Sequence, residues 1–320
     1  MRPKSQTRGA TAQAGLAEGT VVRSLGTLHR IRSEEGAFFD CVVRGQLRIR
    51  GSESTHPVAV GDRVSFTPGN EDNPGVIAEV QPRRNYLLRK AIGHAHKVHI
   101  LAANLDQAIL LYTVEQPATS LGFANRFLIT AAAYEIPAIV VINKTDILTQ
   151  PAQQQRLAEV IEIYTRIGYP VYPIVANDPA YRELAISLLK DKVSFIGGHS
   201  GVGKSAFLNL ADPSLNLKTG NISDYSSKGK HTTTYAEMYD LATGGSLIDS
   251  PGIKELGITD MEPEELAHFF PEMEKLRSEC RFSNCVHINE PGCKIREAVS
   301  EGQIHPSRYD SYVKMLEDMK

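Results

Sequence analysis

The sequence predicts three successive regions: a small antiparallel β-barrel, a doubly wound α/β sheet and a mainly helical C-terminal region. Three observations support this order. Short runs of β-branched and aromatic residues, separated by Gly, Ser, Asn, Asp and Pro, fill the first part of the chain. Apolar strand-like runs then alternate with helical patterns, as a doubly wound sheet requires. Three of the four cysteines follow in one short C-terminal stretch.

The first part of the chain contains an arm and a barrel. Residues 1–19 are basic and lack hydrophobic periodicity, which predicts a disordered basic arm. From Thr20 to about Gln81 the strand-like runs predict an N-terminal OB-type β-barrel, and we place this domain at residues 20–95. Within it, "PRRNYLLRKA" is interpreted as a basic linker. Cys41 lies in a strand-like run and is expected to be a core residue.

Alternating strands and helices predict the α/β domain over residues 96–258. The apolar runs that begin at Gln107 and Ala138 are typical of buried parallel strands, and "PVYPIVA" and "VSFIGG" predict two more. Helices are expected at "ANRFLITAAAYE", from about Pro151 to Ile167, and near Ala180 to Lys190.

Composition and charge limit the function classes. Hydrophobic residues make up 42% of the chain and charged residues 22%. No apolar run approaches the roughly 18 residues of a membrane span and no signal-peptide pattern is present, so we expect a cytoplasmic protein with no membrane partner. Residues 1–105 carry 15 Lys and Arg against 9 Asp and Glu. This excess favours a polyanionic partner, although a solvated surface explains it equally well.

A phosphate-binding loop follows the predicted strand "VSFIGG". The segment "GHSGVGKS" matches the pattern G-x-x-x-x-G-K-[ST], whose glycines let backbone N–H groups surround phosphates at the start of a helix. Lys204 is expected to neutralise the β- and γ-phosphates, and Ser205 to bind Mg²⁺. The nucleotide-binding residues predicted here are Gly198, Ser200, Gly201, Val202, Gly203, Lys204 and Ser205.

A second motif, "NKTD", ends the predicted strand that begins at Ala138. The Asp146 carboxylate can accept hydrogen bonds from N1–H and the 2-amino group of guanine, a donor pair that adenine lacks. Asn143 is expected to brace the loop, and the Lys144 stem to cover the ring. The motif therefore favours GTP over ATP. A P-loop ATPase or kinase is the alternative, and in that case "NKTD" would occur in the sequence by chance.

Two more segments are expected to contact the γ-phosphate and Mg²⁺. Asp249 begins a D-x-x-G loop, in which Asp249 would reach Mg²⁺ through water and the Gly252 N–H would contact the γ-phosphate. Three threonines at 232–234 lie in a polar segment that leads into a strand, as a switch requires. We favour Thr233 among them as the Mg²⁺ ligand.

The residue after the D-x-x-G loop affects catalysis. Ile253 stands where many GTPases place the glutamine that orients the attacking water. His231 is the nearest polar candidate for that role, with an ordinary surface histidine as the alternative. His199 in the phosphate loop is interpreted as a variable position. The predicted catalytic residues are Lys204, His231 and Thr233. Because Ile253 cannot orient the attacking water, an alternative function is an RNA-binding scaffold whose GTPase is vestigial.

The order of the motifs is unusual. They run base loop, phosphate loop, threonine switch and D-x-x-G loop, which is a circular permutation of the usual GTPase order. Such a permutation need not disturb the sheet, because the termini of a domain often lie close together. The D-x-x-G loop then leads directly into the C-terminal region, so nucleotide state can bias the pose of that region.

Residues 259–320 form the third predicted domain, which is mainly helical and zinc-binding. Its candidate ligands are Cys280, Cys285, His287 and Cys293. Three thiolates and one imidazole suit a closed, structural Zn²⁺, with unrelated buried cysteines as the alternative. Cys285 and His287 would point the same way in a strand, and Pro291-Gly292 predicts a turn back to the metal. A zinc hydrolase is disfavoured, because four protein ligands leave no position for water.

The chain resembles the RsgA family, the circularly permuted GTPases of small ribosomal subunit biogenesis. The resemblance rests on the order "NKTD", "GHSGVGKS", "KHTTT", "DSPGI", on the cysteine cluster and on the barrel, and it covers nearly all of the chain after the arm. It implies hydrolysis of GTP to GDP and phosphate, stimulated by the 30S subunit. It also implies contacts of the OB and zinc domains with 16S rRNA, and a role in late assembly.

The resemblance also carries residue roles. It supports His231 as catalytic, Thr233 as the switch threonine, and the four cluster residues as zinc ligands. The chain departs from the family at "VAN" (175–177), where a Ser-Ala-like turn over the base is expected, and no residue is assigned there. A monomer is the default expectation.

Overall fold

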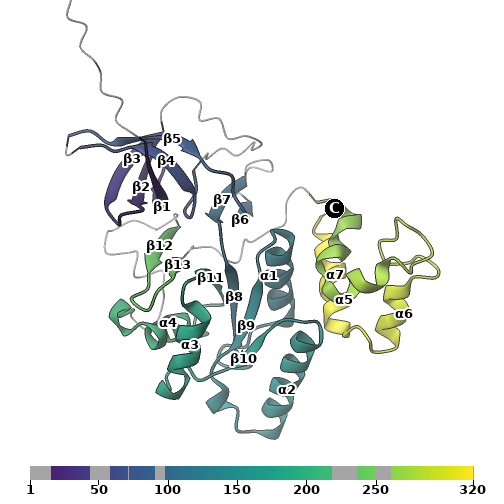
Figure 1. The fold of residues 1–320 in the computed structure, drawn as a ribbon. Coiled ribbons are helices and arrows are strands. Elements are labelled where there is room, and N and C mark those ends of the chain that lie inside the picture. Colours follow the sequence, from purple (N-terminus) through teal and green to yellow (C-terminus); the bar gives the residue numbers. More distant parts are fainter. Residues whose placement is uncertain are drawn as a thin grey trace, which may run out of the picture.

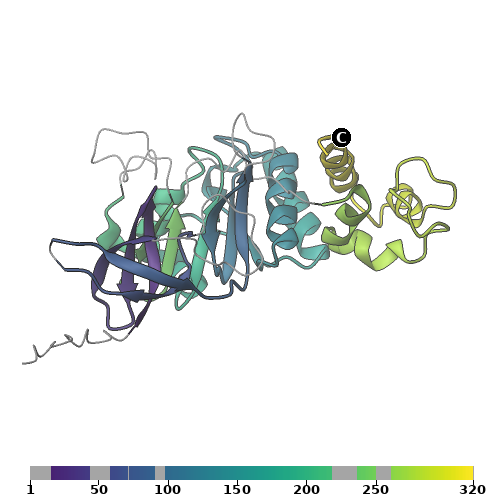
Figure 2. The same cartoon turned by 90° about the horizontal axis from the view of Figure 1, so that it is seen from above.

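The structure is a computed structural model that describes residues 16–43, 58–70, 72–90, 98–217, 236–249 and 261–319. These residues form a β-barrel, a central α/β sheet and a helical C-terminal region, arranged in a row (Figures 1 and 2). The C-terminal helices lie beside helix α1 (Leu121–Ala133), on the side away from the barrel. Within the described ranges, every helix is too short or too polar to span a membrane.

Five strands in the described residues form the barrel. They are β1 (Ala17–Leu25), β2 (Leu28–Ser33), β3 (Phe38–Val43), β4 (Arg63–Thr67) and β5 (Gly75–Val80). Their order is β1-β2-β3-β5-β4, and β4 pairs back onto β1, which closes the barrel and confirms the OB-type prediction. Because β1 begins at Ala17, the last three residues of the predicted arm belong to the barrel, and residues 1–15 lie outside the described chain.

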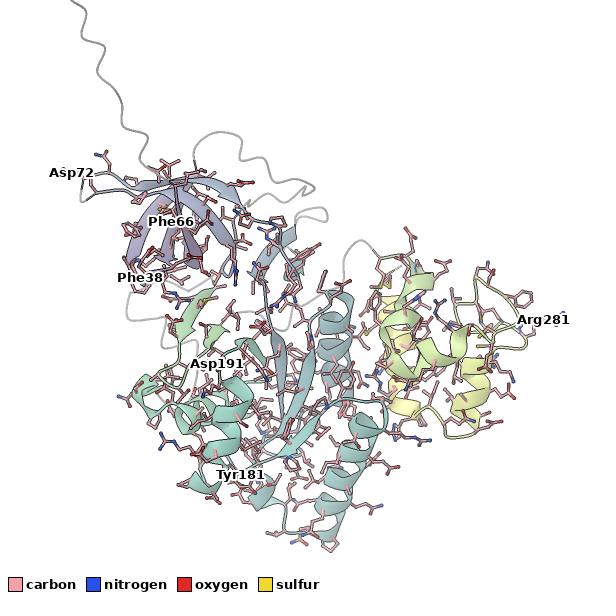
Figure 3. All side chains as sticks on the ribbon, in the orientation of Figure 1. Phe38, Phe66, Asp72, Tyr181, Asp191 and Arg281 are labelled. Carbon is pink, nitrogen blue, oxygen red and sulfur yellow. The ribbon has the colours of Figure 1, made fainter. Side chains whose placement is uncertain are left out.

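The barrel interior is apolar. Phe66 lies inside the barrel and is fully buried, whereas Phe38 at the start of β3 is 58% exposed (Figure 3). Cys41 is fully buried beside Val21, Ile31 and Phe66, as predicted for a core residue. Burial raises the pKa of Cys41 to about 11, so its thiol stays protonated at neutral pH.

The segment predicted as a basic linker forms a strand instead. β6 (Tyr86–Lys90) pairs antiparallel with β7 (Val98–Ala103) in a separate two-stranded sheet between the barrel and the α/β sheet (Figure 1). Leu87 and Leu88 of β6 are buried. The basic residues on both sides of this leucine pair mask its strand pattern in the sequence, so the linker prediction is wrong.

In the part of the chain that the structure describes, the central sheet has six strands. They are β8 (Gln107–Tyr112), β9 (Ala138–Ile142), β10 (Val171–Pro173), β11 (Val193–Gly197), β12 (Glu237–Asp240) and β13 (Ser246–Asp249). Their order is β10-β9-β8-β11-β13-β12, and all run parallel except β12. This is the predicted doubly wound arrangement.

Helices cover both faces of the sheet. α1 and α2 (Pro151–Arg166) pack on one face, and α3 (Arg182–Leu189) and α4 (Lys204–Ala211) pack on the other. The alternation along β8 shows why its sequence is continuously apolar. Leu110 and Tyr112 belong to the core under α1 and α2, whereas Ile109 and Leu111 belong to the core under α3 and α4.

The C-terminal region is mainly helical, as predicted. It contains a 3₁₀ segment η6 (Pro263–Phe269), α5 (Pro271–Arg277), α6 (Lys294–Ser300) and α7 (Pro306–Glu317). α7 packs along α1 (Figure 1), and Ile129 of α1 shares one apolar cluster with Phe270, Met273 and Tyr312. The C-terminal region and α1 therefore share one core.

The barrel joins the central sheet through strand β12. β12 pairs antiparallel with β13 on one side and with β1 on the other, where Glu237 lies opposite Arg23. The described strands of the barrel and of the central sheet thus form one eleven-stranded sheet. Two ion pairs, Arg23 with Glu237 and Arg32 with Asp240, lie across this junction.

Candidate functional site

The parallel sheet brings the predicted nucleotide-binding motifs to one edge. "NKTD" follows β9, the phosphate loop follows β11, and Asp249 is the last residue of β13. All three strands run parallel, so their carboxyl ends meet at the edge where α/β proteins bind ligands. His231, Thr233, Gly252 and Ile253 lie outside the described residues.

The phosphate loop turns the chain from β11 into α4. Gly201 (φ 84°) and Gly203 (φ 98°) have left-handed conformations that favour glycine. A Cβ on Gly203 would lie 2.2 Å from the side-chain nitrogen of Asn143, so the loop could not keep this path with a larger residue. Lys204 Nζ donates to the carbonyls of Gly198 and His199, both at 2.9 Å. The ammonium therefore lies within the curl of the loop.

Asn143 connects three loops, which extends its predicted bracing role. Its Nδ2 donates to the Val202 carbonyl at 2.8 Å, and its Oδ1 accepts from the Ala176 N–H at 2.8 Å. Asn143 is only 3% exposed. Its amide therefore fixes the base loop against the phosphate loop and against the loop after β10.

The other two predicted base-loop residues lie at the surface of this edge. Lys144 adopts a left-handed conformation (φ 62°), and its Nζ donates to the Gln116 carbonyl. Asp146 is exposed, and its carboxylate has no hydrogen bond to any residue in the described part of the chain. A donor pair can therefore approach Asp146 from solvent.

The loop after β10 departs from the expected sequence but forms a tight turn. The Asp178 N–H donates to the Val175 carbonyl at 2.9 Å, and the Ala176 N–H is occupied by Asn143. Asn177 between them is exposed. Asn177 is therefore an exposed residue of this loop, between two residues whose N–H groups are already bonded.

The phosphate loop also contacts helix α1. The ring of His199 packs against Phe123 in the first turn of α1, with ring centroids 3.9 Å apart. Ser205, at the start of α4, is 6% exposed. Sequence reasoning missed the loop before α1, residues 113–120, whose polar and proline-containing pattern "TVEQPATS" was the available signal.

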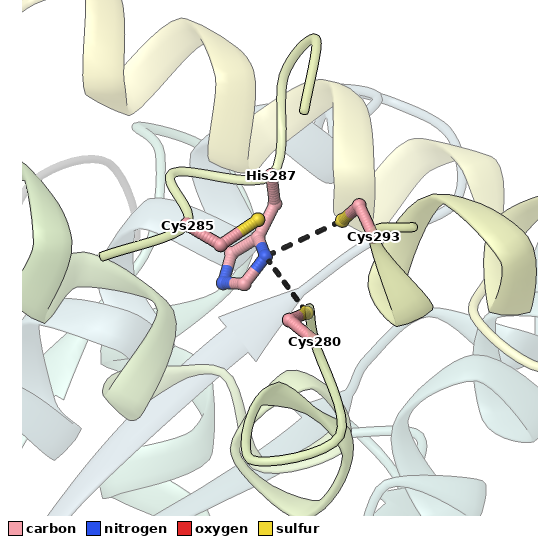
Figure 4. Close-up of side chains that lie close together, drawn as sticks. All are labelled: Cys280, Cys285, His287 and Cys293. Carbon is pink, nitrogen blue, oxygen red and sulfur yellow. Dashed lines mark hydrogen bonds between the residues drawn. The ribbon is translucent and has the colours of Figure 1, made fainter. Parts of the chain in front are cut away.

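The predicted metal ligands converge in the C-terminal region (Figure 4). The ligand atoms of Cys280, Cys285, His287 and Cys293 all lie within 4.8 Å of one another. His287 Nδ1 is 3.6 Å from Cys280 Sγ and 3.4 Å from Cys293 Sγ. A tetrahedral ion bound at ordinary Zn–S and Zn–N lengths separates sulfur from nitrogen by about 3.6 Å. The donor set and its spacing therefore fit a tetrahedral metal ion.

The ligands reach this arrangement without the strand expected between Cys285 and His287. That segment is irregular, and His287 has a left-handed conformation (φ 59°) that turns its ring toward the cysteines. The predicted turn at Pro291-Gly292 is present, with Gly292 at φ 71°, and it leads directly into Cys293. The strand argument is wrong, because two left-handed residues in a loop bring the ligands together.

Neighbouring side chains hold this loop in place. The Glu290 carboxylate accepts from the backbone N–H groups of Val286, Ile288 and Asn289. The Tyr309 hydroxyl donates to the His287 carbonyl at 2.7 Å. The loop path is therefore fixed by contacts other than the metal ligands themselves.

Burial shapes the chemistry of the cluster. Desolvation raises the pKa of Cys285 to about 12 and raises that of Cys293, so these thiols need a nearby cation to ionise. Desolvation also lowers the pKa of His287, which favours the neutral imidazole that binds metals.

Two family profiles match the chain. One, described as the RsgA N-terminal domain, matches residues 18–77, and the other, described as the RsgA GTPase, matches residues 80–259. The second profile covers both the base loop and the phosphate loop.

One curated relative and two solved structures are similar to the chain over nearly its whole length. The chain is 44% identical to the "Small ribosomal subunit biogenesis GTPase RsgA" of Flavobacterium johnsoniae over 301 residues, which is 93% of this chain and 92% of that relative. Its fold is similar to the crystal structure of YjeQ from Thermotoga maritima, with a TM-score of 0.75, 36% identity and coverage of 95% and 98% of the two chains. It is also similar to YloQ, described as a circularly permuted GTPase, with a TM-score of 0.71, 28% identity and coverage of 98% and 99%. The chain therefore belongs to the RsgA family of circularly permuted GTPases, which hydrolyse GTP.

Proposed function

We propose that this GTPase binds the 30S ribosomal subunit, hydrolyses GTP in a ribosome-stimulated manner, and acts as a late assembly factor of the small subunit. The name of the relative from Flavobacterium johnsoniae, a small-subunit biogenesis GTPase, supports the ribosomal partner. The observation that carries the nucleotide part is the Asn143 amide, which joins the base and phosphate loops at the sheet edge. The proposal includes a cytoplasmic monomer and contacts with 16S rRNA.

Guanine nucleotide recognition is assigned to residues on both loops. Asp146 accepts from the guanine N1–H and 2-amino groups, the Lys144 stem covers the base, and the exposed Asn177 offers its N–H to the guanine carbonyl. Lys204 leaves the loop carbonyls to neutralise the β- and γ-phosphates. Backbone N–H groups of the phosphate loop, with that of Gly252, surround the phosphates.

Hydrolysis is assigned to residues around Mg²⁺ and the γ-phosphate. Ser205, Thr233 and Asp249 hold Mg²⁺ directly or through water, and the ion offsets negative charge that develops on the phosphate oxygens. Because Ile253 cannot orient water, His231 does so.

The cluster in the C-terminal region is assigned one structural Zn²⁺. Three thiolates and one imidazole complete a tetrahedral shell, which leaves no position for a reacting water. The metal therefore stabilises the region instead of taking part in hydrolysis. The proposal also includes the domain boundaries, with the barrel domain extended to begin at Ala17 (17–95) and the other two domains at 96–258 and 259–320.

The proposal is tested by GTP turnover with and without 30S subunits, at fixed Mg²⁺ and salt. GTPases with incomplete sites turn over at roughly 10⁻⁴ to 10⁻² per second without a partner. We expect 30S subunits, but not 50S subunits or bulk RNA, to raise this rate by orders of magnitude. His231→Ala should lose most of the gain while still binding GTP. Equal slow turnover with every partner would favour an RNA-binding scaffold with a vestigial GTPase.

A further inference from the structure

The loop that joins β8 to α1, residues 113–120, contacts both nucleotide-binding loops. The Gln116 carbonyl accepts the hydrogen bond from Lys144 Nζ in the base loop. A Cβ on Gly201 would lie 3.4 Å from Pro117 Cδ, so the proline ring packs beside the phosphate loop. No sequence motif assigns a role to this loop, which the structure places between the two motifs that bind nucleotide.

Two buried threonines hold the exposed tip of this loop. Thr113 is fully buried and Thr119 is 4% exposed, whereas residues 116–118 are exposed. The Thr113 hydroxyl donates to the Pro117 carbonyl at 2.5 Å. The Thr113 N–H donates to the Thr119 hydroxyl at 3.2 Å, and the Thr119 N–H donates to the Thr113 carbonyl at 2.9 Å. The first of these bonds fixes the tip to Thr113, directly after β8, and the other two close the base of the loop.

Gln116 and Lys144, which are joined by a hydrogen bond, both have unfavourable backbone conformations. Gln116 (φ 52°) and Lys144 (φ 62°) are left-handed, a conformation that non-glycine residues rarely adopt. Such conformations persist only where the surroundings fix them, and they cluster at ligand-binding sites. Two of them joined by a hydrogen bond indicate that the position of the Lys144 side chain is closely controlled.

The acceptor at Gln116 suits a lysine that covers a base. A neutral backbone carbonyl fixes the end of the side chain without cancelling its positive charge. It also holds four rotatable carbon–carbon bonds in one arrangement before the nucleotide arrives, so less side-chain entropy is lost on binding. A bound nucleotide should therefore be released more slowly.

We propose that residues 113–120 form a positioning loop for the guanine nucleotide, in which Thr113 fixes the turn and Gln116 fixes Lys144 over the base. This inference rests on the proposed assignment of "NKTD" as the guanine-binding loop. Thr113 is a positioning residue that acts through Lys144. It controls how long the nucleotide stays bound, and it leaves the chemical step unchanged.

The test uses two variants of Thr113 in the full-length protein. Thr113→Val keeps the β-branched shape and removes the hydroxyl, whereas Thr113→Ser keeps the hydroxyl. The dissociation rate of a fluorescent GDP is measured by stopped flow with excess unlabelled GDP. Loss of one hydrogen bond predicts a rate about tenfold higher for Thr113→Val and within about twofold of wild type for Thr113→Ser. Single-turnover hydrolysis at saturating GTP should not change.

A double-mutant cycle separates positioning from a purely structural role. Lys144→Ala should accelerate GDP release, and adding Thr113→Val to it should have little further effect, because the two changes act on one contact. Full additivity in this cycle would overturn the proposal. So would a wild-type release rate for Thr113→Val.

A third variant and a reference variant complete the test. Pro117→Gly changes an exposed position, so it probes the same loop if Thr113→Val does not fold, and it should also accelerate release. Asp146→Ala must weaken GDP binding if "NKTD" reads guanine. If Asp146→Ala binds GDP normally, the base-loop assignment itself fails. If only Asp146→Ala weakens binding, the positioning loop alone is refuted.

Discussion

The barrel and the C-terminal region are attached to opposite sides of the central sheet by different kinds of contact. The barrel meets β12 through strand pairing and two partly exposed ion pairs, in which Arg23 is 38% and Arg32 is 27% exposed. The C-terminal region meets α1 through a shared apolar cluster and a buried polar network. The first junction pairs strands and also places Val22 and Val60 in the core of the central sheet, whereas the second pairs no strands and contains the buried polar network.

The buried network centres on Arg308, whose side chain is fully buried. It forms a two-point ion pair with Glu272, at 2.6 and 3.3 Å, and donates to Asn125 Oδ1 on α1 at 3.0 Å. The Tyr164 hydroxyl of α2 donates to the same oxygen at 3.0 Å. Every polar group in this set therefore has a partner inside the interface.

The difference between the junctions indicates which part responds to nucleotide state. β13 ends at Asp249 of the D-x-x-G loop, and its neighbour β12 carries the barrel. The C-terminal region is fixed to α1, whose Phe123 packs against His199 of the phosphate loop. We therefore expect γ-phosphate contacts to be transmitted to the barrel more strongly than to the C-terminal region.

Removal of the metal should have the largest effect on the C-terminal junction. Cys285 and Cys293 belong to the apolar cluster that also contains Ile129 of α1, so loss of the ion disturbs the whole cluster. After treatment with a strong chelator, hydrogen exchange should accelerate across residues 261–319 and in α1, but not in β1 to β5. Unchanged protection of residues 261–319 in metal-free protein would contradict a structural metal.

Breaking the buried ion pair should have the next largest effect. Arg308→Ala leaves the Glu272 carboxylate buried without its partner, which costs about 3–5 kcal/mol of unfolding free energy. Arg126→Ala is the matched control, because Arg126 of α1 is 38% exposed and pairs with Asp318, directly after α7, at the same junction. That variant should lose less than about 1 kcal/mol in the same urea titration. Equal losses would show that the buried network is not what holds this junction.

A pH-dependent contact stabilises the hairpin that carries the barrel. Burial alone would raise the pKa of Asp212, but hydrogen bonds from Ser214 and from the Ala242 N–H lower it. The ionised Asp212 carboxylate therefore stabilises the folded state fully above the unfolded pKa of about 3.9. This stabilisation is lost as pH falls through the lower pKa of the folded state. Asp212→Asn should lower the free energy of unfolding by about 2 kcal/mol at pH 7, and the difference between the variant and wild type should shrink below about pH 4. A difference that stays constant from pH 7 to pH 3 would exclude this origin.

The exposed ion pairs of the barrel junction should contribute least. Arg32→Ala removes a partly exposed pair with Asp240 and should change the unfolding free energy by less than about 1 kcal/mol. It should still increase hydrogen exchange in β12, because the pair of Arg32 with Asp240 joins this strand to the barrel. A loss as large as that of Arg308→Ala would make the two junctions equivalent.

The elements that the sequence predicted correctly are those with local signals. The apolar runs of β8, β9 and β11 and the glycine pattern of the phosphate loop are readable within a few residues. The contacts that it did not predict join distant segments. Asn143 reaches Val202 and Ala176, and Arg308 pairs with Glu272 although charged residues on a helix usually face solvent.

Two errors have the same physical origin. Leu87 and Leu88 looked like part of a basic linker, because the basic residues beside them hide the strand pattern and the pairing of β6 with β7 has no local signal. The metal ligands seemed to need a strand, because the left-handed conformation of His287 has no sequence signal. In both cases tertiary contacts decided the local structure.

Hydrogen exchange in the GDP-bound state and in a state bound to a non-hydrolysable GTP analogue compares the two junctions most directly. The account predicts that exchange changes in β12, β13 and the adjoining barrel strand β1, while α7 and the contacting face of α1 stay unchanged. The opposite pattern, with changes in α7 and none in β1, would contradict the account. It would show that the C-terminal region, and not the barrel, responds to the bound nucleotide.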